Sequence, residues 1–193
     1  MKFLTVLLTI AFSIAIPLKV GAQVANPLLI NPSAVPMQNI ASSNADSLWR
    51  PTPIQLTHIE SITKKYFTAR DNNKFEDAYS QLSSRQKQFL KFTEYKKILE
   101  EFNSNAGKSK GRELRVITWY KDTAQAGPGL YVAVDFVSAF ENLALHCGYV
   151  VWQEQQDGSY LLVREEVNVI DNTTMAKLKP GDLEKVYAQY RCK

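Results

Sequence analysis

The chain has 193 residues, of which 45% are hydrophobic and 22% are charged, and its formal net charge is +4 at pH 7. This charge is too small to indicate a nucleic acid as partner, because nucleic-acid-binding domains gather Lys and Arg on one face. The one basic cluster, Lys108, Lys110 and Arg112, lies among Gly and Ser residues and is expected to form a solvated loop.

The first residues have the pattern of a secretory signal peptide, which we predict over residues 1–22. Lys2 precedes an apolar run from Phe3 to Ile16, Pro17 ends the run, and Val20-Gly21-Ala22 supplies the small residues of a cleavage site. The run is shorter than the roughly 20 residues of a membrane-spanning helix, which argues against the alternative of an uncleaved anchor. We therefore expect a periplasmic or secreted protein with no stable membrane span after cleavage. Cleavage removes two lysines and lowers the formal charge from +4 to +2.

Residues 23–56 are rich in Pro, Asn, Ser and Ala and sustain no apolar period. A segment of this kind buries too little surface to offset the entropy lost on ordering, so we expect a flexible leader. Trp49 is the one residue in it that is expected to dock onto the folded part.

A folded α+β domain is predicted over residues 57–172, and it begins with helical patterns. Thr57 and Glu60 have the spacing of a capping box at the start of a first helix. A second helix is expected to begin at Phe75. Ser83 and Gln86 have the spacing to cap a further helical turn, and Thr93 is expected to open the last helix of this part.

The second half of this domain changes to strand patterns, rich in β-branched and aromatic residues. The expected strands are Glu113–Tyr120, Leu130–Phe140, Leu143–Glu154 and Ser159–Ile170. Residues 173–193 are predicted to be a C-terminal extension with a short helix over Gly181–Tyr190. Helices followed by a strand meander predict three N-terminal helices packed on a four-stranded antiparallel sheet.

Two cysteines remain after cleavage, Cys147 and Cys192. An even number of cysteines in an oxidising compartment favours a disulfide, and closing a loop of this length contributes about 4 kcal/mol in the chain-entropy model. The alternative is that Cys147 is a buried free thiol in a strand.

Several short motifs resemble those of an uncharacterised bacterial family of exported proteins. They are Ser84-Arg85, Pro128-Gly129-Leu130-Tyr131, the aromatic-ended strand Phe136–Phe140 and Asp157-Gly158. Over Ile59–Asp171 the chain is similar to domain-of-unknown-function family 4019, within the nuclear-transport-factor-like (cystatin-like) superfamily. The last strand departs from the family pattern, since it ends in Arg164-Glu165-Glu166-Val167-Asn168. The resemblance implies that the sheet is curved into a cone and that the protein is exported, and it implies no reaction.

No motif of a metalloprotease, a serine hydrolase or a dinucleotide-binding protein is present in the sequence. With two histidines in all, a dedicated zinc site is not expected. We expect neither a metal nor a cofactor.

A register argument gives the candidate site residues. If both hairpins turn on two residues, Asp135 faces Gly148 with His146 as diagonal neighbour, and Val150 faces Glu165. Asp135, His146 and Glu165 would then share one face, with Asp135 or Glu165 as a general base and His146 as its partner. The candidate ligand-binding residues are Tyr131, Trp152 and Arg164.

The structural alternatives to this site stay open. His146 can be a hydrogen-bonded structural residue, and Arg164 and Glu166 can form a structural ion pair. The opposite face carries the bulkier stripe, and it is expected to seat the helices. This stripe comprises Leu130, Val132, Val134, Phe136, Phe140, Leu145, Cys147, Tyr149, Val151 and Leu162. A one-residue slip in register would move the three candidate residues to different faces.

These patterns predict an exported small-ligand-binding or protein-interaction domain of the bacterial envelope. A first alternative is a small cone-fold isomerase or hydratase that uses Asp135 and His146. A second alternative is a periplasmic assembly subunit or homodimer, because a sheet with apolar residues on both faces needs a second layer or a partner.

Overall fold

A five-stranded mixed sheet forms the centre of the protein in a computed structural model that describes residues 30–42 and 48–189. The strands lie in chain order across the sheet: β1 (Met37–Ser42), β2 (Ser109–Thr123), β3 (Gly127–Phe140), β4 (Leu143–Glu154) and β5 (Tyr160–Asp171). β1 pairs with β2 in parallel, and every other pair is antiparallel. The α+β class is as predicted, but a four-stranded antiparallel sheet is wrong. The additional strand is β1. Four of its six side chains are exposed, so it has no apolar period that the sequence could reveal, and it is defined by its backbone pairing with β2.

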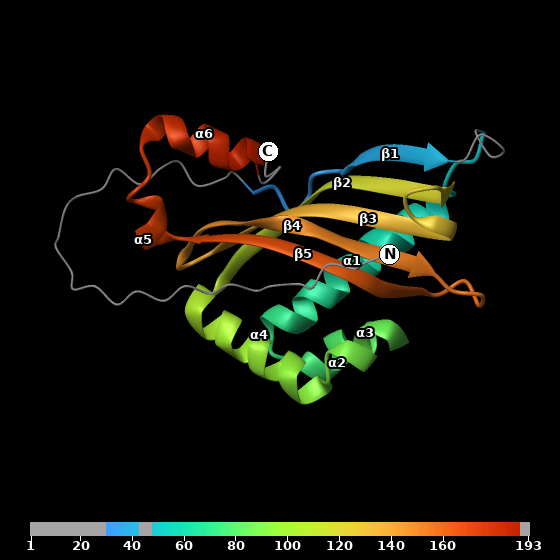
Figure 1. The fold of residues 1–193 in the computed structure, drawn as a ribbon, viewed down its shortest axis with the longest axis horizontal. Coiled ribbons are helices and arrows are strands. Elements are labelled where there is room, and N and C mark those ends of the chain that lie inside the picture. Colours follow the sequence, from blue (N-terminus) through green and yellow to red (C-terminus); the bar gives the residue numbers. More distant parts are fainter. Residues whose placement is uncertain (1–29, 43–47, 190–193) are drawn as a thin grey trace.

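Four helices, α1 (Pro53–Asp71), α2 (Phe75–Ser80), α3 (Ser84–Phe89) and α4 (Phe92–Ala106), connect β1 to β2 and cover one face of the sheet (Figure 1). The expected arrangement of three helices at the N-terminal end is therefore wrong in number and in position. Two shorter helices, α5 (Asn172–Met175) and α6 (Pro180–Gln189), follow β5 and lie on the opposite side of the sheet (Figure 1). Within the ranges that the structure describes, none of these helices has the length and apolar character needed to cross a membrane.

The start of α1 is set by Thr52, five residues before the expected capping box. The Thr52 hydroxyl accepts a hydrogen bond from the backbone N–H of Gln55, and the Gln55 side chain accepts one from the N–H of Thr52. Pro53 occupies the first turn, where its missing N–H costs nothing. Thr57 lies inside the helix and donates its hydroxyl to the carbonyl of Pro53. In α3, by contrast, the predicted cap is confirmed, since the Ser83 hydroxyl accepts from the N–H of Gln86.

The main core lies between helices α1–α4 and the sheet. Its largest fully buried side chains include Trp119, Trp152, Tyr66, Phe67 and Phe136. Both buried indoles keep a partner for their N–H group, since Trp152 donates to the hydroxyl of Thr63 and Trp119 donates to the side-chain carbonyl of Gln38 in β1. Burying a large apolar side chain contributes about 1.5–3 kcal/mol, so this layer dominates the stability of the fold.

The expected docking of Trp49 onto the folded domain is confirmed. Its ring packs against the main core, and its centroid lies 6.0 Å from that of Trp119. The segment that holds Trp49 and β1 is therefore joined to the domain by side chains as well as by the backbone.

The register between β3 and β4 differs by one residue from the expected one. Asp135 lies opposite Tyr149, and Phe136 lies opposite Gly148. The tip of the hairpin is responsible, because its backbone does not close a two-residue turn. The N–H of Glu141 donates to Lys108, and that of Asn142 donates to Ala106, so the end of α4 holds the tip instead.

This slip changes which residues of β4 face the helices, while β3 behaves as predicted. Val132, Val134 and Phe136 pack against the helices as expected. The assignment of Leu145 and Cys147 to this side is wrong. They lie in a second cluster with residues of α5 and α6, which comprises Val137, Leu145, Cys147, Ile170 and Met175, with Ile30, Ala144, Leu178, Val186 and Tyr187 at its margin.

Between β4 and β5 the pairing of Val150 with Glu165 is confirmed. Gly148 lies in the same region and permits a close approach of β5, since a Cβ atom there would lie 1.9 Å from the carbonyl oxygen of Glu166.

Two sequence predictions fall on residues outside the described ranges: the signal peptide over 1–22 and the Cys192 end of the disulfide. Cys147 itself is buried in the second cluster, with 1% of its surface exposed. The disulfide between the two residues stays a prediction.

Candidate functional site

The sheet separates the candidate site residues into two sets on opposite faces. His146, Trp152 and Glu165 lie on the face that α1–α4 cover. Tyr131, Asp135 and Arg164 alternate with buried neighbours and lie on the other face. Because β4 is shifted by one residue relative to β3, Asp135 and His146 do not meet at one site.

The residues on the outer face have structural contacts. The hydroxyl of Tyr131 accepts a hydrogen bond of 3.0 Å from the side-chain amide of Gln153. Arg164 forms an ion pair with Glu166 and lies over the ring of Tyr149, as the structural interpretation of this cluster predicts. Burial, together with the hydrogen bond to Glu166, raises the pKa of Tyr149 to about 12. The ion pair is about half exposed, and pairs of this kind contribute about 0–1 kcal/mol.

On the inner face, Trp152 is a core residue and is closed to ligands. Its ring is fully buried, and it packs edge-on against Tyr66 with the centroids 6.0 Å apart. Its N–H group is satisfied by the hydroxyl of Thr63, 2.9 Å away.

Glu165 belongs to a buried network with two residues of α1. Its carboxylate forms an ion pair with Arg70 and accepts a hydrogen bond of 2.7 Å from the hydroxyl of Tyr66. Burial, and after it the nearby carboxylate, raises the pKa of Tyr66 well above its usual value. Burial by itself lowers the pKa of Arg70, but Glu165, Tyr66 and Tyr95 together outweigh this effect and raise it. Glu165 is therefore committed to a charge pair, which does not suit a general base.

A second buried pair, Arg112 with Asp71, lies beside the first. The two carboxylate oxygens of Asp71 accept hydrogen bonds of 3.0 and 3.3 Å from Nη1 and Nη2 of Arg112. The Nε of Arg112 donates to the hydroxyl of Ser138. The guanidinium also lies 3.9 Å from the ring centroid of Phe67. Burial lowers the pKa of Arg112. The expectation of a solvated loop is therefore wrong for Arg112, whose side chain is only 11% exposed, because β2 already begins at Ser109 and turns this side chain under α1.

His146 lies at the same end of the inner face, enclosed by three phenylalanine rings. The ring centroids of Phe102, Phe136 and Phe140 lie 5.3, 5.6 and 5.0 Å from that of His146. Neither ring nitrogen has a hydrogen-bond partner among the residues that the structure describes. Burial, followed by the charges of Arg112 and Arg70, lowers its pKa well below the usual value. The folded protein therefore favours the neutral form of His146.

An open groove lies above these pairs, between the end of α1 and helix α4. It consists of two hollows of about 540 and about 630 Å³ that share Asn73 and Asn103. The Asn103 amide donates to the side-chain oxygen of Asn73 at 2.8 Å and to the carbonyl of Arg70 at 2.9 Å. Asn73 has a φ of 58°, a left-handed conformation that Asn tolerates and that ends the turn after α1. We call the two hollows together the α1–α4 groove.

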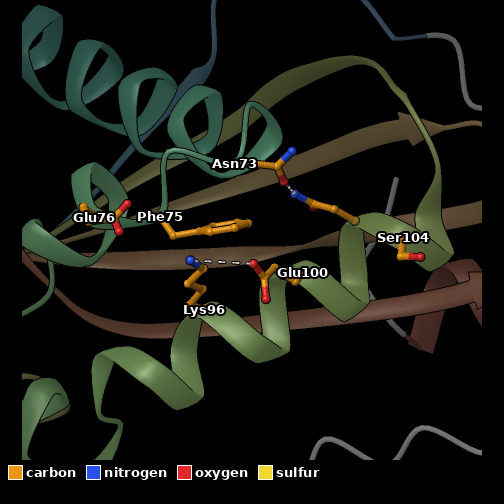
Figure 2. A pocket seen from close by; sticks show the side chains of 7 residues that line it. Asn73, Phe75, Glu76, Lys96, Glu100 and Ser104 are labelled. Carbon is orange, nitrogen blue, oxygen red and sulfur yellow. Dashed lines mark hydrogen bonds and ion pairs between the residues drawn. The ribbon is translucent and has the colours of Figure 1, made fainter.

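The two hollows of the α1–α4 groove have similar chemistry. Figure 2 shows the first, in which the ring of Phe75 points into the space between Asn73 and the Lys96–Glu100 pair. The second is lined by polar groups of α1, α4 and the start of β2, with the edge of Phe140 as its aromatic wall. Each hollow therefore combines amide or hydroxyl groups, charges of both signs and one aromatic side chain.

The sequence did not indicate this groove. Asn73 and Asn103 lie 30 residues apart in the chain. Their proximity depends on the packing of α1 against α4, and no local pattern reports it. No cluster of three or more acidic, His or Cys side chains that could bind a metal ion occurs in residues 30–42 and 48–189.

The fold and groove define a class: an α+β domain with a helix-covered mixed sheet and a polar groove at one end of the helical layer. A family model, "Protein of unknown function (DUF4019)", matches residues 62–164, more than half of the 193 residues. The chain belongs to this family, as the short motifs indicated. Neither a search of curated proteins nor a search of solved structures gives a match.

Proposed function

We propose that this protein is an exported binding domain of the bacterial envelope that holds a polar, uncharged ligand in the α1–α4 groove. The observation that carries the proposal is the Asn73–Asn103 pair at the junction of the two hollows. The NH2 group of Asn103 already donates to Asn73 and to the carbonyl of Arg70. The pair therefore offers a ligand the NH2 group of Asn73 as donor and the side-chain oxygen of Asn103 as acceptor, which suits the amides or hydroxyls of a ligand.

The charges of the groove argue against an ionic ligand. The first hollow holds Glu76 and Glu100 with Lys96, and the second holds Asp71, already paired with Arg112, and Lys108. A groove with both signs of charge creates no strong field for an anion or a cation. The aromatic side chains of the two hollows, Phe75 and Phe140, are only 3% and 5% exposed, so polar contacts rather than ring stacking would hold the ligand.

Export is part of the proposal and rests on the sequence. The charged start, the apolar run and the small residues before position 23 support it, as does the even number of cysteines. The separation of Asp135 and His146 by the sheet gives no support to an isomerase or hydratase that uses both, so we propose binding rather than catalysis.

The test of this proposal combines mass spectrometry with a titration. Native mass spectrometry of the protein purified from the envelope reports any retained small molecule. In parallel, blocked dipeptides and N-acetylated disaccharides are titrated while the side-chain amide signals of Asn73 and Asn103 are followed by NMR. We expect at least one of these probes to shift both signals at concentrations up to about 10 mM, the range of a weak small-molecule complex.

A matched pair of variants locates the binding. Ser104 is exposed and lines the first hollow, whereas its neighbour Asn105 is exposed on α4 outside the groove. Ser104→Trp should fill the hollow and abolish the shifts, and Asn105→Trp should leave them unchanged. Equal effects of the two variants, or no retained molecule together with no shift from any probe, would contradict a ligand site in this groove.

A further inference from the structure

The open edge of the sheet at β1 is poorly protected. β1 pairs with β2 on one side, and in the described part of the chain it is the last strand on its side of the sheet (Figure 1). Four of its six side chains are exposed, among them Met37 at 67% and Ile40 at 36%. An edge strand presents unpaired backbone N–H and C=O groups to any strand that approaches.

The sequence around β1 lacks the charged side chains that commonly block such an approach, although Pro36 directly precedes the strand. Residues 20–45 contain no Asp, Glu, Lys or Arg. Natural edge strands are commonly guarded by charged side chains, and the opposite edge of this sheet has them. There, β5 carries the consecutive charged residues Arg164, Glu165 and Glu166, and Leu162 bridges to Leu82 of the helical layer.

We propose that two copies of this chain associate through their β1 edges, which pair antiparallel about a two-fold axis and join the two sheets. A two-fold axis brings only the residues nearest to it close to their own copies, so a charge there meets a like charge. The absence of charges over residues 20–45 removes this repulsion and favours a second copy over a strand of another protein, for which complementary charges would provide selectivity.

The position of β1 in the chain adds to this argument. The family match covers residues 62–164 and thus includes β2 but not β1. β1 therefore covers an edge of the family portion of the fold and creates a new one. It is held there by the Gln38–Trp119 hydrogen bond of 3.0 Å as well as by the backbone ladder, so it presents a fixed edge to a partner.

The test measures the mass of the exported chain by light scattering and sedimentation over a concentration series, with and without reductant. Asn39 is exposed and lies in the middle of β1. In Asn39→Lys, like charges meet near the axis, and we expect the dimer dissociation constant to rise by about tenfold or more. The same should hold for Asn39→Glu, and an equimolar mixture of the two variants should restore the dimer. Gln88→Lys, on the exposed side of α3, is the control and should associate like the unmodified chain.

Several results would overturn the proposal. One is a monomer at every concentration, and another is a dimer that neither Asn39 variant weakens, since the interface would then lie elsewhere. A third is a mixture of the two variants that fails to associate while Trp119 fluorescence shows that β1 is still docked. Co-purification of a different protein paired with β1 would likewise reject the second copy as the partner.

Discussion

Replacing His146 by leucine should make the protein more stable, and more so at low pH. The side chain is 2% exposed and packs among three phenylalanine rings, and neither ring nitrogen has a hydrogen-bond partner in residues 30–42 and 48–189. A buried polar group without a partner costs about 1–3 kcal/mol, so an apolar side chain of similar size should raise the free energy of unfolding at pH 8.

The pH dependence follows from the lowered pKa of His146 in the folded protein. Its ordinary value is 6.5. As the pH falls below this value, the unfolded chain therefore binds a proton before the folded protein does, and the free energy of unfolding decreases. For one group that stays neutral in the folded state, the loss between pH 8 and pH 5 is about 2 kcal/mol. The advantage of His146→Leu over the unmodified chain should grow by that amount.

Urea unfolding followed by tryptophan fluorescence at pH 8, 7, 6 and 5 measures both effects. His58 is exposed on α1, so His58→Leu is the matched control and should show no such growth. If His146→Leu and the unmodified chain have parallel pH profiles, the buried histidine is not neutral in the folded state and the reasoning is refuted.

Three further predictions concern the fold. Gly148→Ala should prevent native folding or lower the melting temperature sharply, because the added Cβ would lie 1.9 Å from a backbone oxygen of β5. Thermal melting followed by circular dichroism measures this effect. A decrease of only a few degrees would argue against the close approach of the two strands. Arg70→Met and Glu165→Gln should each destabilise the protein, the former by about 3–5 kcal/mol, and together by less than the sum of the two. A double-mutant cycle in urea measures the coupling, and additive effects would show that the pair does not interact. Peptide mapping of the exported chain should find Cys147 linked to Cys192, and reduction should cost about 4 kcal/mol of stability. Two free thiols in the natively purified protein would contradict the link.

The local patterns of the sequence were sufficient for much of the fold. β4 runs from Leu143 to Glu154 as the alternation of residue types predicts, and the apolar stripe on β3 faces the helices. These features depend on neighbours within a few residues, and such neighbours are visible in the chain. The docking of Trp49 was also predicted, because a large aromatic ring in an otherwise small and polar segment is most readily buried against a core.

The candidate site could not be found in the same way. A hairpin of two residues was the simplest assumption between β3 and β4, but the backbone at Glu141 and Asn142 bonds to the end of α4 instead. These hydrogen bonds shift the register between β3 and β4 by one residue. Because side chains alternate between the two faces of a strand, Asp135 and His146 then lie on opposite faces of the sheet. The contact that decides it joins segments more than thirty residues apart.

The sequence by itself determined the α+β class, the family, and most of the strands, because these follow from short-range periodicity and short motifs. The tertiary structure alone decided that β1 joins the sheet, that Arg112 is buried against Asp71, and that Asn73 meets Asn103 across a groove. The physical reason is the same in each case. A backbone edge, a buried charge and a paired amide are stabilised by partners that are distant in the chain, and the residue itself carries no local sign of which partner it will have.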